Sequence, residues 1–179
     1  MGIFDFFKKK DVRRYDATDV RVVDMEEGYV FDYDLSTWTV SKTYIYDWGD
    51  NFFSKDHKIT NGKDTYYLSV CDDDELEISL LTKVRISSFE VDIPHYIKEN
   101  EEPPRRITYE GVDYTRESGE AGYINEGDDW EEMMSWTYYD IDNKRILCIE
   151  QFDEDEFEAS YGKLIKEYEI SNILPGNRN

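Results

Sequence analysis

The chain has 179 residues, which is enough for one ordinary domain. Its formal net charge of −21 repels nucleic acid and anionic lipid headgroups, so we expect no direct nucleic-acid binding and favour a protein partner with a basic surface. Hydrophobic residues make up 39 % of the chain, but 16 % of all residues are aromatic, which favours a folded core over disorder.

The first ten residues, MGIFDFFKKK, combine apolar bulk with positive charge. A helix would gather the four apolar side chains on one side, directly before three cations, as in a short interfacial anchor. These residues are Ile3, Phe4, Phe6, Phe7, Lys8, Lys9 and Lys10. We interpret residues 1–14 as an amphipathic segment that contacts a membrane or a partner. The alternative is that its aromatic residues dock on the chain's own domain.

Residues 15–179 are predicted to form a single β-rich domain. From Tyr29 onward, apolar and polar residues alternate with the period of a β-strand. Asn61-Gly62 is a strong hairpin signal, and Asp92-Ile93-Pro94 predicts a short helix that runs through Glu101. The charged, proline-containing stretch 99–106 is predicted to join two halves. The Gly-rich stretch Ser118–Gly127 is predicted to be a loop.

Two segments resemble each other, LSVCDDDELEIS (68–79) and LCIEQFDEDEFEAS (147–160), and each reads as a strand, an acidic turn and a strand. They predict pseudo-repeats over about 29–98 and 107–176. The predicted fold is mainly β: one antiparallel domain, a sandwich or a partly open barrel, with one or two short helices. An α+β domain is the alternative.

No catalytic, metal or cofactor signature accompanies this pattern. The sequence lacks GxGxxG, GxxxxGK[ST], GxSxG and HExxH, and His57 and His95 read as packing or surface residues. Cys71 and Cys148 lie in apolar strands and are predicted to be buried free thiols, which fits a reducing cytoplasm. We therefore expect a protein that is not an enzyme and needs no cofactor.

Two tryptophans in acidic turns are the candidate contact residues. Trp48 lies beside Asp47 and Asp50, and Trp130 lies within another acidic stretch. An aromatic ring surrounded by carboxylates suits a cation, such as an amine or a basic side chain. The alternative is that both rings fold back into the core.

Several longer segments resemble an uncharacterised bacterial family, the domain of unknown function numbered 4178. They include YIYDWGD (44–50), YYLSVCDDDELEISL (66–80), WEEMMSWTYYD (130–140) and LCIEQFDEDEFEASYGK (147–163), and the resemblance covers about residues 29–176. The family has no established activity, so no catalytic residue carries over. The resemblance implies a genomic context of phage-shock-protein-A-like membrane-remodelling proteins, small membrane proteins and polyamine synthesis.

The leading hypothesis is a non-enzymatic acidic adaptor in bacterial envelope stress or membrane maintenance, which acts with phage-shock-protein-A-like partners. It would be cytoplasmic, with peripheral contact at the inner face of the membrane. A second hypothesis is an acidic inhibitor or immunity-type protein that blocks a basic partner. A third is the binding of polyamines or other cations.

Overall fold

The structure is a computed structural model that describes residues 20–127 and 129–176, and it is dominated by β-strands. Before the helix the strands are β1 (Val30–Tyr33), β2 (Ser36–Asp47), β3 (Phe53–Thr60), β4 (Thr65–Asp72) and β5 (Leu76–Val84). After it follow β6 (Arg106–Tyr109), β7 (Val112–Glu126), β8 (Asp129–Tyr139), β9 (Arg145–Asp153), β10 (Glu156–Ile165) and β11 (Ser171–Leu174). The α-helix is α1 (Ile93–Asn100), and the 3-10 helices are η1 (Val22–Asp24), η2 (Ile86–Ser88) and η3 (Glu167–Glu169).

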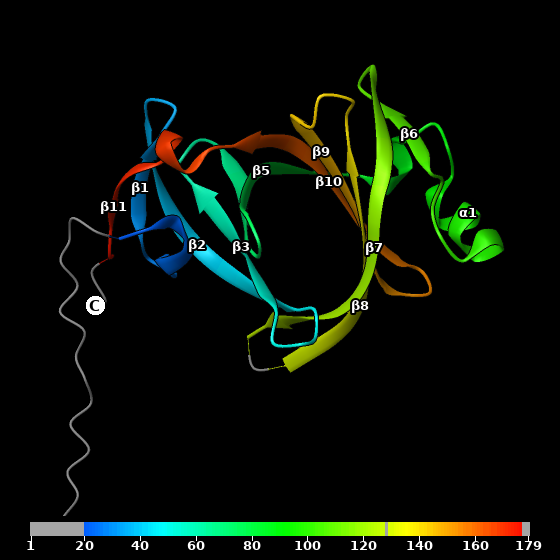
Figure 1. Cartoon of the computed structure of the whole chain (residues 1–179), viewed down its shortest axis with the longest axis horizontal. Coiled ribbons are helices and arrows are strands. Elements are labelled where there is room, and N and C mark those ends of the chain that lie inside the picture. Colours follow the sequence, from blue (N-terminus) through cyan, green and yellow to red (C-terminus); the bar gives the residue numbers. More distant parts are fainter. Residues whose placement is uncertain (1–19, 128, 177–179) are drawn as a thin grey trace, which may run out of the picture.

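All the strands belong to one antiparallel sheet, in the order β11-β1-β2-β3-β4-β5-β10-β9-β8-β7-β6. The sheet closes on itself because β2 also pairs with β7, which makes a ring of eight strands (Figure 1). The prediction of a mainly antiparallel β domain with a short helix is confirmed. The sequence left two arrangements open, a sandwich and a partly open barrel. A single closed sheet excludes a sandwich of two separate sheets.

The local signals in the sequence account for the turns. Gly62 adopts a φ of 87° between β3 and β4, and the Asn61 side chain accepts hydrogen bonds from the next backbone amides, as the hairpin signal predicted. The Asp92 carboxylate accepts from the backbone N–H of His95 at 3.1 Å and so caps α1. The two acidic runs form the turns of the β4–β5 and β9–β10 hairpins.

The loop predicted for Ser118–Gly127 is wrong, because β7 runs through this stretch to Glu126. Its glycines are needed for packing. A Cβ atom at Gly119 would lie 2.7 Å from the Trp136 ring, and one at Gly122 would lie 2.8 Å from the Trp48 ring. These two positions can stay in the strand only without a side chain.

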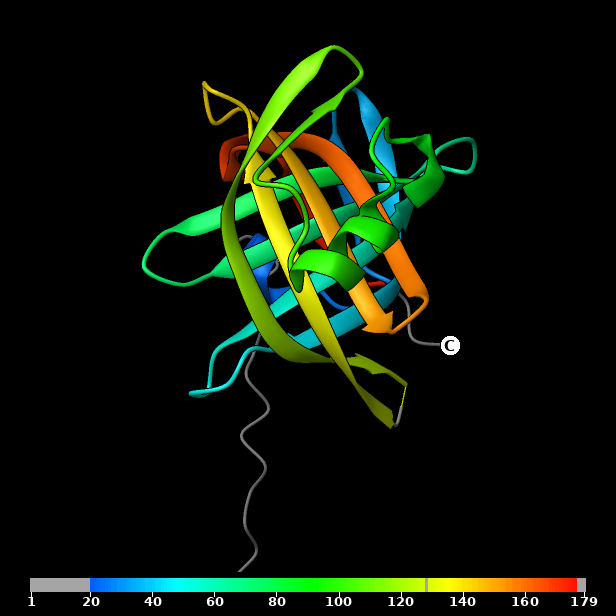
Figure 2. The ribbon, with the colours of Figure 1, turned by 90° about the vertical axis from the view of Figure 1, so that its right-hand side faces the viewer.

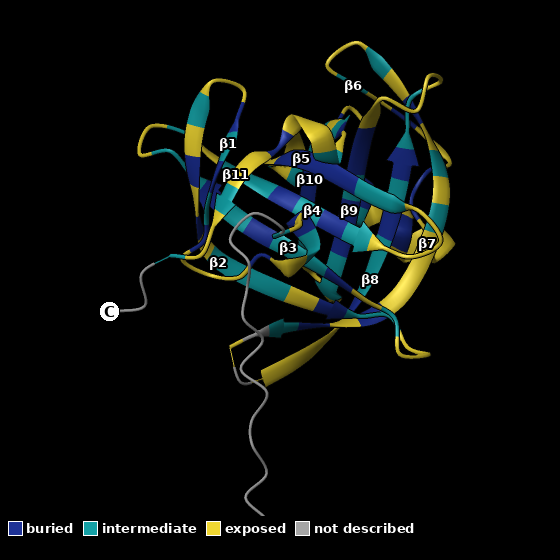
Figure 3. Cartoon of the chain, turned by 60° about the vertical axis from the view of Figure 1, so that its left-hand side comes forward, coloured by how far each residue is buried: buried dark blue, intermediate teal, exposed yellow. Residues whose placement is uncertain are grey.

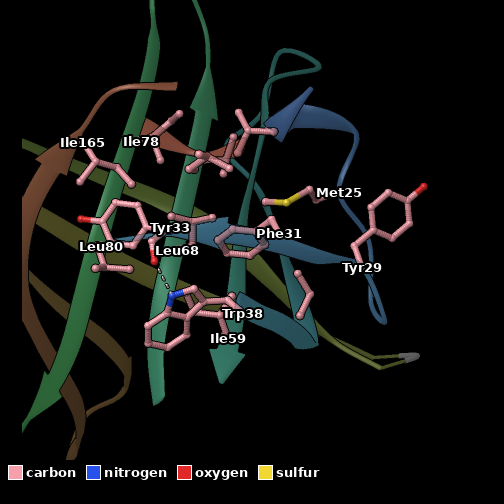
Figure 4. Packing of buried hydrophobic residues seen from close by; sticks show 14 residues of the cluster. Met25, Tyr29, Phe31, Tyr33, Trp38, Ile59, Leu68, Ile78, Leu80 and Ile165 are labelled. Atoms are coloured by element: carbon pink, nitrogen blue, oxygen red, sulfur yellow. Dashed lines mark hydrogen bonds between the residues drawn. The ribbon is translucent and has the colours of Figure 1, made fainter. Parts of the chain in front are cut away.

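Two large hydrophobic cores lie on the outer face of the ring, and a third, smaller cluster contains Tyr46, Ile124 and Met133, of which Tyr46 and Ile124 face the interior. The first packs β3, β4 and β5 under β1, β11 and η1, and there the Trp38 indole N–H donates to the Tyr33 carbonyl at 3.1 Å (Figure 4). The second packs β7 to β10 under α1 and β6; Figure 2 shows α1 lying across this face. Buried and less buried residues therefore alternate along the strands (Figure 3). The side chains that point the other way face the interior of the ring.

Candidate functional site

The interior of the ring is the candidate site, because small polar side chains line it. On β5, Ile78 and Leu80 point outward into the first core, while Glu77, Ser79 and Lys83 point inward. The same alternation on the other strands brings five serines, two cysteines and a threonine to the inner wall. They are Ser54, Ser69, Ser79, Ser135, Ser160, Cys71, Cys148 and Thr137.

These short side chains leave two adjoining cavities of about 270 Å³ and about 180 Å³. Tyr46 and Asp56 belong to the walls of both cavities, so they stand between them. Ser79 and Ser160 are at most 4 % exposed and face the larger cavity. A polar cavity of this size is suited to hold water or a small polar ligand.

The cavity walls are strongly acidic. Six carboxyl groups line the larger cavity and three more line the smaller one, whereas Lys83 is the single basic side chain on the described walls. The nine acidic residues are Asp56, Asp73, Glu77, Glu117, Glu120, Glu131, Glu150, Glu156 and Glu158. Glu131, Glu156 and Glu158 are exposed and mark the mouth of the smaller cavity, and Glu150 is buried further in. A cation that enters here meets carboxylates along its whole path.

Lys83 shows how an ammonium group is held in this site. Its Nζ lies 3.4 Å from Glu150 Oε2, is bonded to Glu158 Oε2, and sits 5.3 Å from the centre of the Tyr67 ring. Burial on its own would lower the pKa of Lys83, but the charges of Glu150 and Glu158 outweigh it and hold the pKa above its usual value. Lys83 therefore stays charged, between two carboxylates and an aromatic face.

This one ammonium group does not balance the acids around it. Burial raises the pKa of Asp56, although hydrogen bonds from Ser69 and Tyr46 and the charge of Lys83 partly offset that effect. Burial also raises the pKa of Glu150, with Lys83 opposing the shift and the negative charge of Asp56 adding to it. Asp56 and Glu150 thus repel each other across the cavity. A second cation between them would relieve this repulsion.

The other reactive groups in the cavity are kept in their neutral forms. Burial, followed by the charge of Glu77, raises the pKa of Cys71 to about 11, and burial raises that of Cys148 as well. Both thiols are therefore protonated and poorly nucleophilic at neutral pH. Both are free cysteines, as the sequence predicted, but each residue is only partly buried rather than fully buried. The Tyr139 hydroxyl donates to Glu77 Oε1 at 2.8 Å, which orients that carboxylate.

Trp48 forms one end of the larger cavity. Its ring stacks on Tyr46 with centroids 5.5 Å apart and planes 4° from parallel, and its indole N–H donates to Ser54 Oγ at 2.9 Å. Its other side lines an outer groove of about 620 Å³, together with Gly122 and Met133. The ring is partly buried against the small hydrophobic cluster of Tyr46, Ile124 and Met133, and it forms a wall between the interior and the outer surface.

The structure does not bring all the predicted contact residues together. Asp47 accepts from the backbone N–H of Gly49 at 2.9 Å and so shapes the turn that carries Trp48, while Asp50 is exposed in the same turn. Trp130 lies on the outer face of β8, about half exposed, and lines neither cavity of the ring. The seven residues of the predicted anchor, from Ile3 to Lys10, lie outside the described residues.

The histidines do not contribute to this site. His57 is fully buried on the outer face of β3, and its Nδ1 lies 2.8 Å from Thr43 Oγ1. His95 is on the surface of α1, beside Glu99. In the part of the chain that the structure covers, no three His, Cys, Asp or Glu residues form a group that could hold a metal ion.

Comparison with known proteins gives a family but no activity. The family described as "Domain of unknown function (DUF4178)" matches residues 26–167. The chain belongs to this family. A relative in Aquifex aeolicus (strain VF5), described as an uncharacterized protein, is 28 % identical over 152 residues, which cover 84 % of this chain and 83 % of the relative. No solved structure matches the chain. The polar interior of this DUF4178 protein is therefore the main guide to what it does.

The structure bears on the predicted membrane contact in one respect only, the character of its helices. Among the described residues, none of the helices has the length and apolar character needed to cross a membrane.

Proposed function

We propose that this DUF4178 protein is a non-enzymatic binding protein that takes up a small organic cation, an amine, inside the ring of strands. The observation that carries the proposal is the setting of Lys83, whose ammonium group is held by Glu150, Glu158 and the Tyr67 ring. A free alkylamine presents the same chemical group. The site has further carboxylates to receive it, and Asp56 is the most central of them.

The concentration of negative charge in a partly desolvated space favours a cationic ligand. Removing carboxylates from bulk water is costly unless a cation or a proton compensates them. Tyrosine faces add to the attraction, because a cation above an aromatic ring is stabilised by the ring's electrons. Besides the contact of Lys83 with Tyr67, the Lys42 ammonium lies 4.7 Å from the centre of the Tyr44 ring at the smaller cavity. Anionic ligands would meet repulsion from every wall.

Binding fits this interior better than catalysis. The thiols are held protonated, and neither histidine faces the cavities. A nucleophile with its own base, which most hydrolytic mechanisms need, has no counterpart among the described residues that line the site.

Titration calorimetry with amines tests the proposal. We expect heat from butylamine, 1,4-diaminobutane and spermidine, and none from the dianion glutarate at the same ionic strength. Asp56→Asn should weaken amine binding by about tenfold or more, since it removes one charged partner. Asp155→Asn, which removes the same charge from an exposed turn outside the cavities, is the matched control. Absence of amine binding at millimolar concentration, or equal losses in both variants, contradicts the proposal.

Chemical rescue gives a second, independent test. Lys83→Ala leaves Glu150 and Glu158 without their ammonium partner, so the variant should melt at a lower temperature than the wild type. Added butylamine should restore part of the loss by occupying the vacated position, whereas sodium chloride at equal ionic strength should not. Lys98→Ala removes an exposed lysine that pairs with Asp155, and its melting temperature should not respond specifically to butylamine. An equal response of the two variants would argue against an amine site.

The adaptor role in envelope stress stays a prediction, because it depends on residues 3–10, which lie outside the described residues. A pull-down from the native bacterium tests it separately. Recovery of soluble metabolic enzymes alone would count against that role.

A further inference from the structure

One edge of β8 is only partly paired. β7 pairs with β8 from Asp129 to Tyr139, whereas β9 pairs with it only from Met134 onward. The β7–β8 hairpin therefore runs past the end of β9 (Figure 2). On the side away from β7, no strand within residues 20–127 and 129–176 pairs with residues 129–133. We call this stretch the free edge of β8.

The register of the hairpin shows which backbone groups point toward the free edge. Glu126 and Asp129 lie opposite each other with only two residues between them, so they exchange both of their backbone hydrogen bonds. Such pairs alternate along an antiparallel ladder, so Glu131 also bonds to β7. The N–H and C=O groups of Trp130 and Glu132 then point the other way. Donors and acceptors thus face outward with the spacing that an added strand needs.

The outer groove of about 620 Å³ lies beside the free edge, where β8 and β9 separate. Glu132 and Met133 of the free edge line it, and so do Phe152 and Asp153 at the end of β9. Trp48 adds a further apolar wall. A strand added along the free edge would run beside this groove, and its alternate side chains would enter it.

The free edge and the groove are acidic. Asp129, Glu131 and Glu132 lie along the free edge, and Asp153 and Glu154 lie on the β9 side of the groove. All five side chains belong to exposed residues. No basic side chain is part of the described lining of the groove.

Two lysines of this region are held outside the groove. Lys98 on α1 is bonded to Asp155, and it also interacts with the charge of Glu154. Lys55 lies in the same cross-strand row as Trp130, but its ammonium group donates to a backbone carbonyl of η1 at 3.1 Å. Neither lysine lines the groove. The groove therefore favours cations from a ligand.

A second copy of this chain does not fit the free edge. Pairing two copies of β8 would bring Asp129, Glu131 and Glu132 close to the same acidic side chains, and each chain has a net charge of −21. Charges on an open edge keep like strands away in this manner. A strand of opposite charge is attracted at the same positions.

We propose that the free edge of β8 binds an extended, lysine- or arginine-rich segment of a partner protein, which adds to the sheet as a further strand. The backbone of the segment bonds to Trp130 and Glu132. Its apolar side chains pack against Met133 and Phe152, and its basic side chains face Glu132 and Asp153. The inference does not rest on amine binding, because Glu132 and Asp153 line neither cavity of the ring.

Fluorescence anisotropy with short labelled peptides tests the inference. The probe is a capped peptide that alternates lysine and valine, and two N-methylated forms of it are the matched controls. Methylation of every second amide blocks hydrogen bonds on one edge of the peptide strand only. One form should therefore bind like the unmodified peptide, and the other should bind about tenfold or more weakly. A peptide that alternates glutamate and valine should not bind.

Two protein variants test the role of charge. Glu132→Gln/Asp153→Asn should weaken binding of the lysine–valine peptide by about threefold to tenfold. Glu110→Gln/Asp142→Asn removes the same charges from exposed turns outside the groove, and this control should bind the peptide like the wild type.

Hydrogen exchange locates the bound strand. The peptide should slow exchange at the amides of Trp130 and Glu132 and leave that of Glu131, which is already bonded to β7, unchanged. Slower exchange instead at β6 or β11, the end strands of the sheet, would overturn the proposal. So would equal binding of both methylated forms, equal losses in both protein variants, or no binding at millimolar concentration. Displacement by butylamine would place the lysine side chains inside the ring and would also overturn it.

Discussion

Replacing the buried His57 by glutamine should remove a large part of the protein's loss of stability in acid. His57 is fully buried on the outer face of β3, and its Nε2 has no hydrogen-bond partner among the described residues. Burial, helped by the positive charge of Lys55, lowers the pKa of His57 from 6.5 to about 4. The folded protein thus resists protonation of this ring across that interval.

The sign follows from proton uptake. Between about pH 6.5 and about pH 4, the unfolded chain binds a proton at His57 that the folded chain does not bind, so acid favours unfolding. The stabilising contribution is complete above the unfolded pKa and is lost as the pH falls toward the folded pKa. A difference of about 2.5 pKa units corresponds to about 3 kcal/mol.

Urea unfolding followed by tryptophan fluorescence at several pH values measures this effect. The free energy of unfolding of the wild type, minus that of His57→Gln, should fall by about 3 kcal/mol between about pH 7 and about pH 4. The raised pKa values of Asp56 and Glu150 act in the opposite direction, but both proteins share them, so they cancel in the difference. His95→Gln controls for the loss of one histidine. A difference that stays constant within about 1 kcal/mol across this range would refute the reasoning.

Three further predictions concern packing, the cavity and the helix. Gly122→Ala should destabilise the protein by about 1–3 kcal/mol in urea unfolding, because the new Cβ would lie 2.8 Å from the Trp48 ring and 2.9 Å from the Asp47 carbonyl oxygen. Ser160→Leu should fill the larger cavity and abolish the rise in melting temperature that amines cause, while far-ultraviolet circular dichroism stays that of the wild type. Asp92→Ala should cost about 1 kcal/mol of unfolding free energy through loss of the α1 cap, and an unchanged stability would show that the cap is not needed.

Local sequence signals predicted the parts of the fold that depend on a few neighbouring residues. The Asn61-Gly62 turn, the Asp92 cap and the two acidic turns each follow from the conformational preferences of adjacent residues. The path of β7 was missed because Gly119 and Gly122 resemble loop residues until their tryptophan neighbours are known. Those neighbours, Trp136 and Trp48, come from other strands.

The site was missed for a related reason. Alternation along a strand shows which residues share a face, but not which face will be covered by β1, β11, α1 and β6. Among 42 acidic residues, no local motif distinguishes Asp56 or Glu150 from a solvated carboxylate. One signal was available: Ser69, Cys71 and Cys148 share the inward parity of otherwise apolar strands, which marks an interior that is neither core nor solvent.

The position of the two cores explains how so polar an interior is compatible with a stable fold. A closed ring of strands usually fills its centre with apolar side chains, and those side chains then supply the burial that stabilises it. Here the two larger cores lie outside the ring, where η1, β1 and β11 cover one half and α1 and β6 cover the other. The interior keeps only the smaller cluster of Tyr46, Ile124 and Met133, so much of the inner wall is released from packing and can carry serines and carboxylates. Substitutions such as Asp56→Asn on that wall should therefore change ligand binding more than folding, whereas losses from the outer cores should do the reverse.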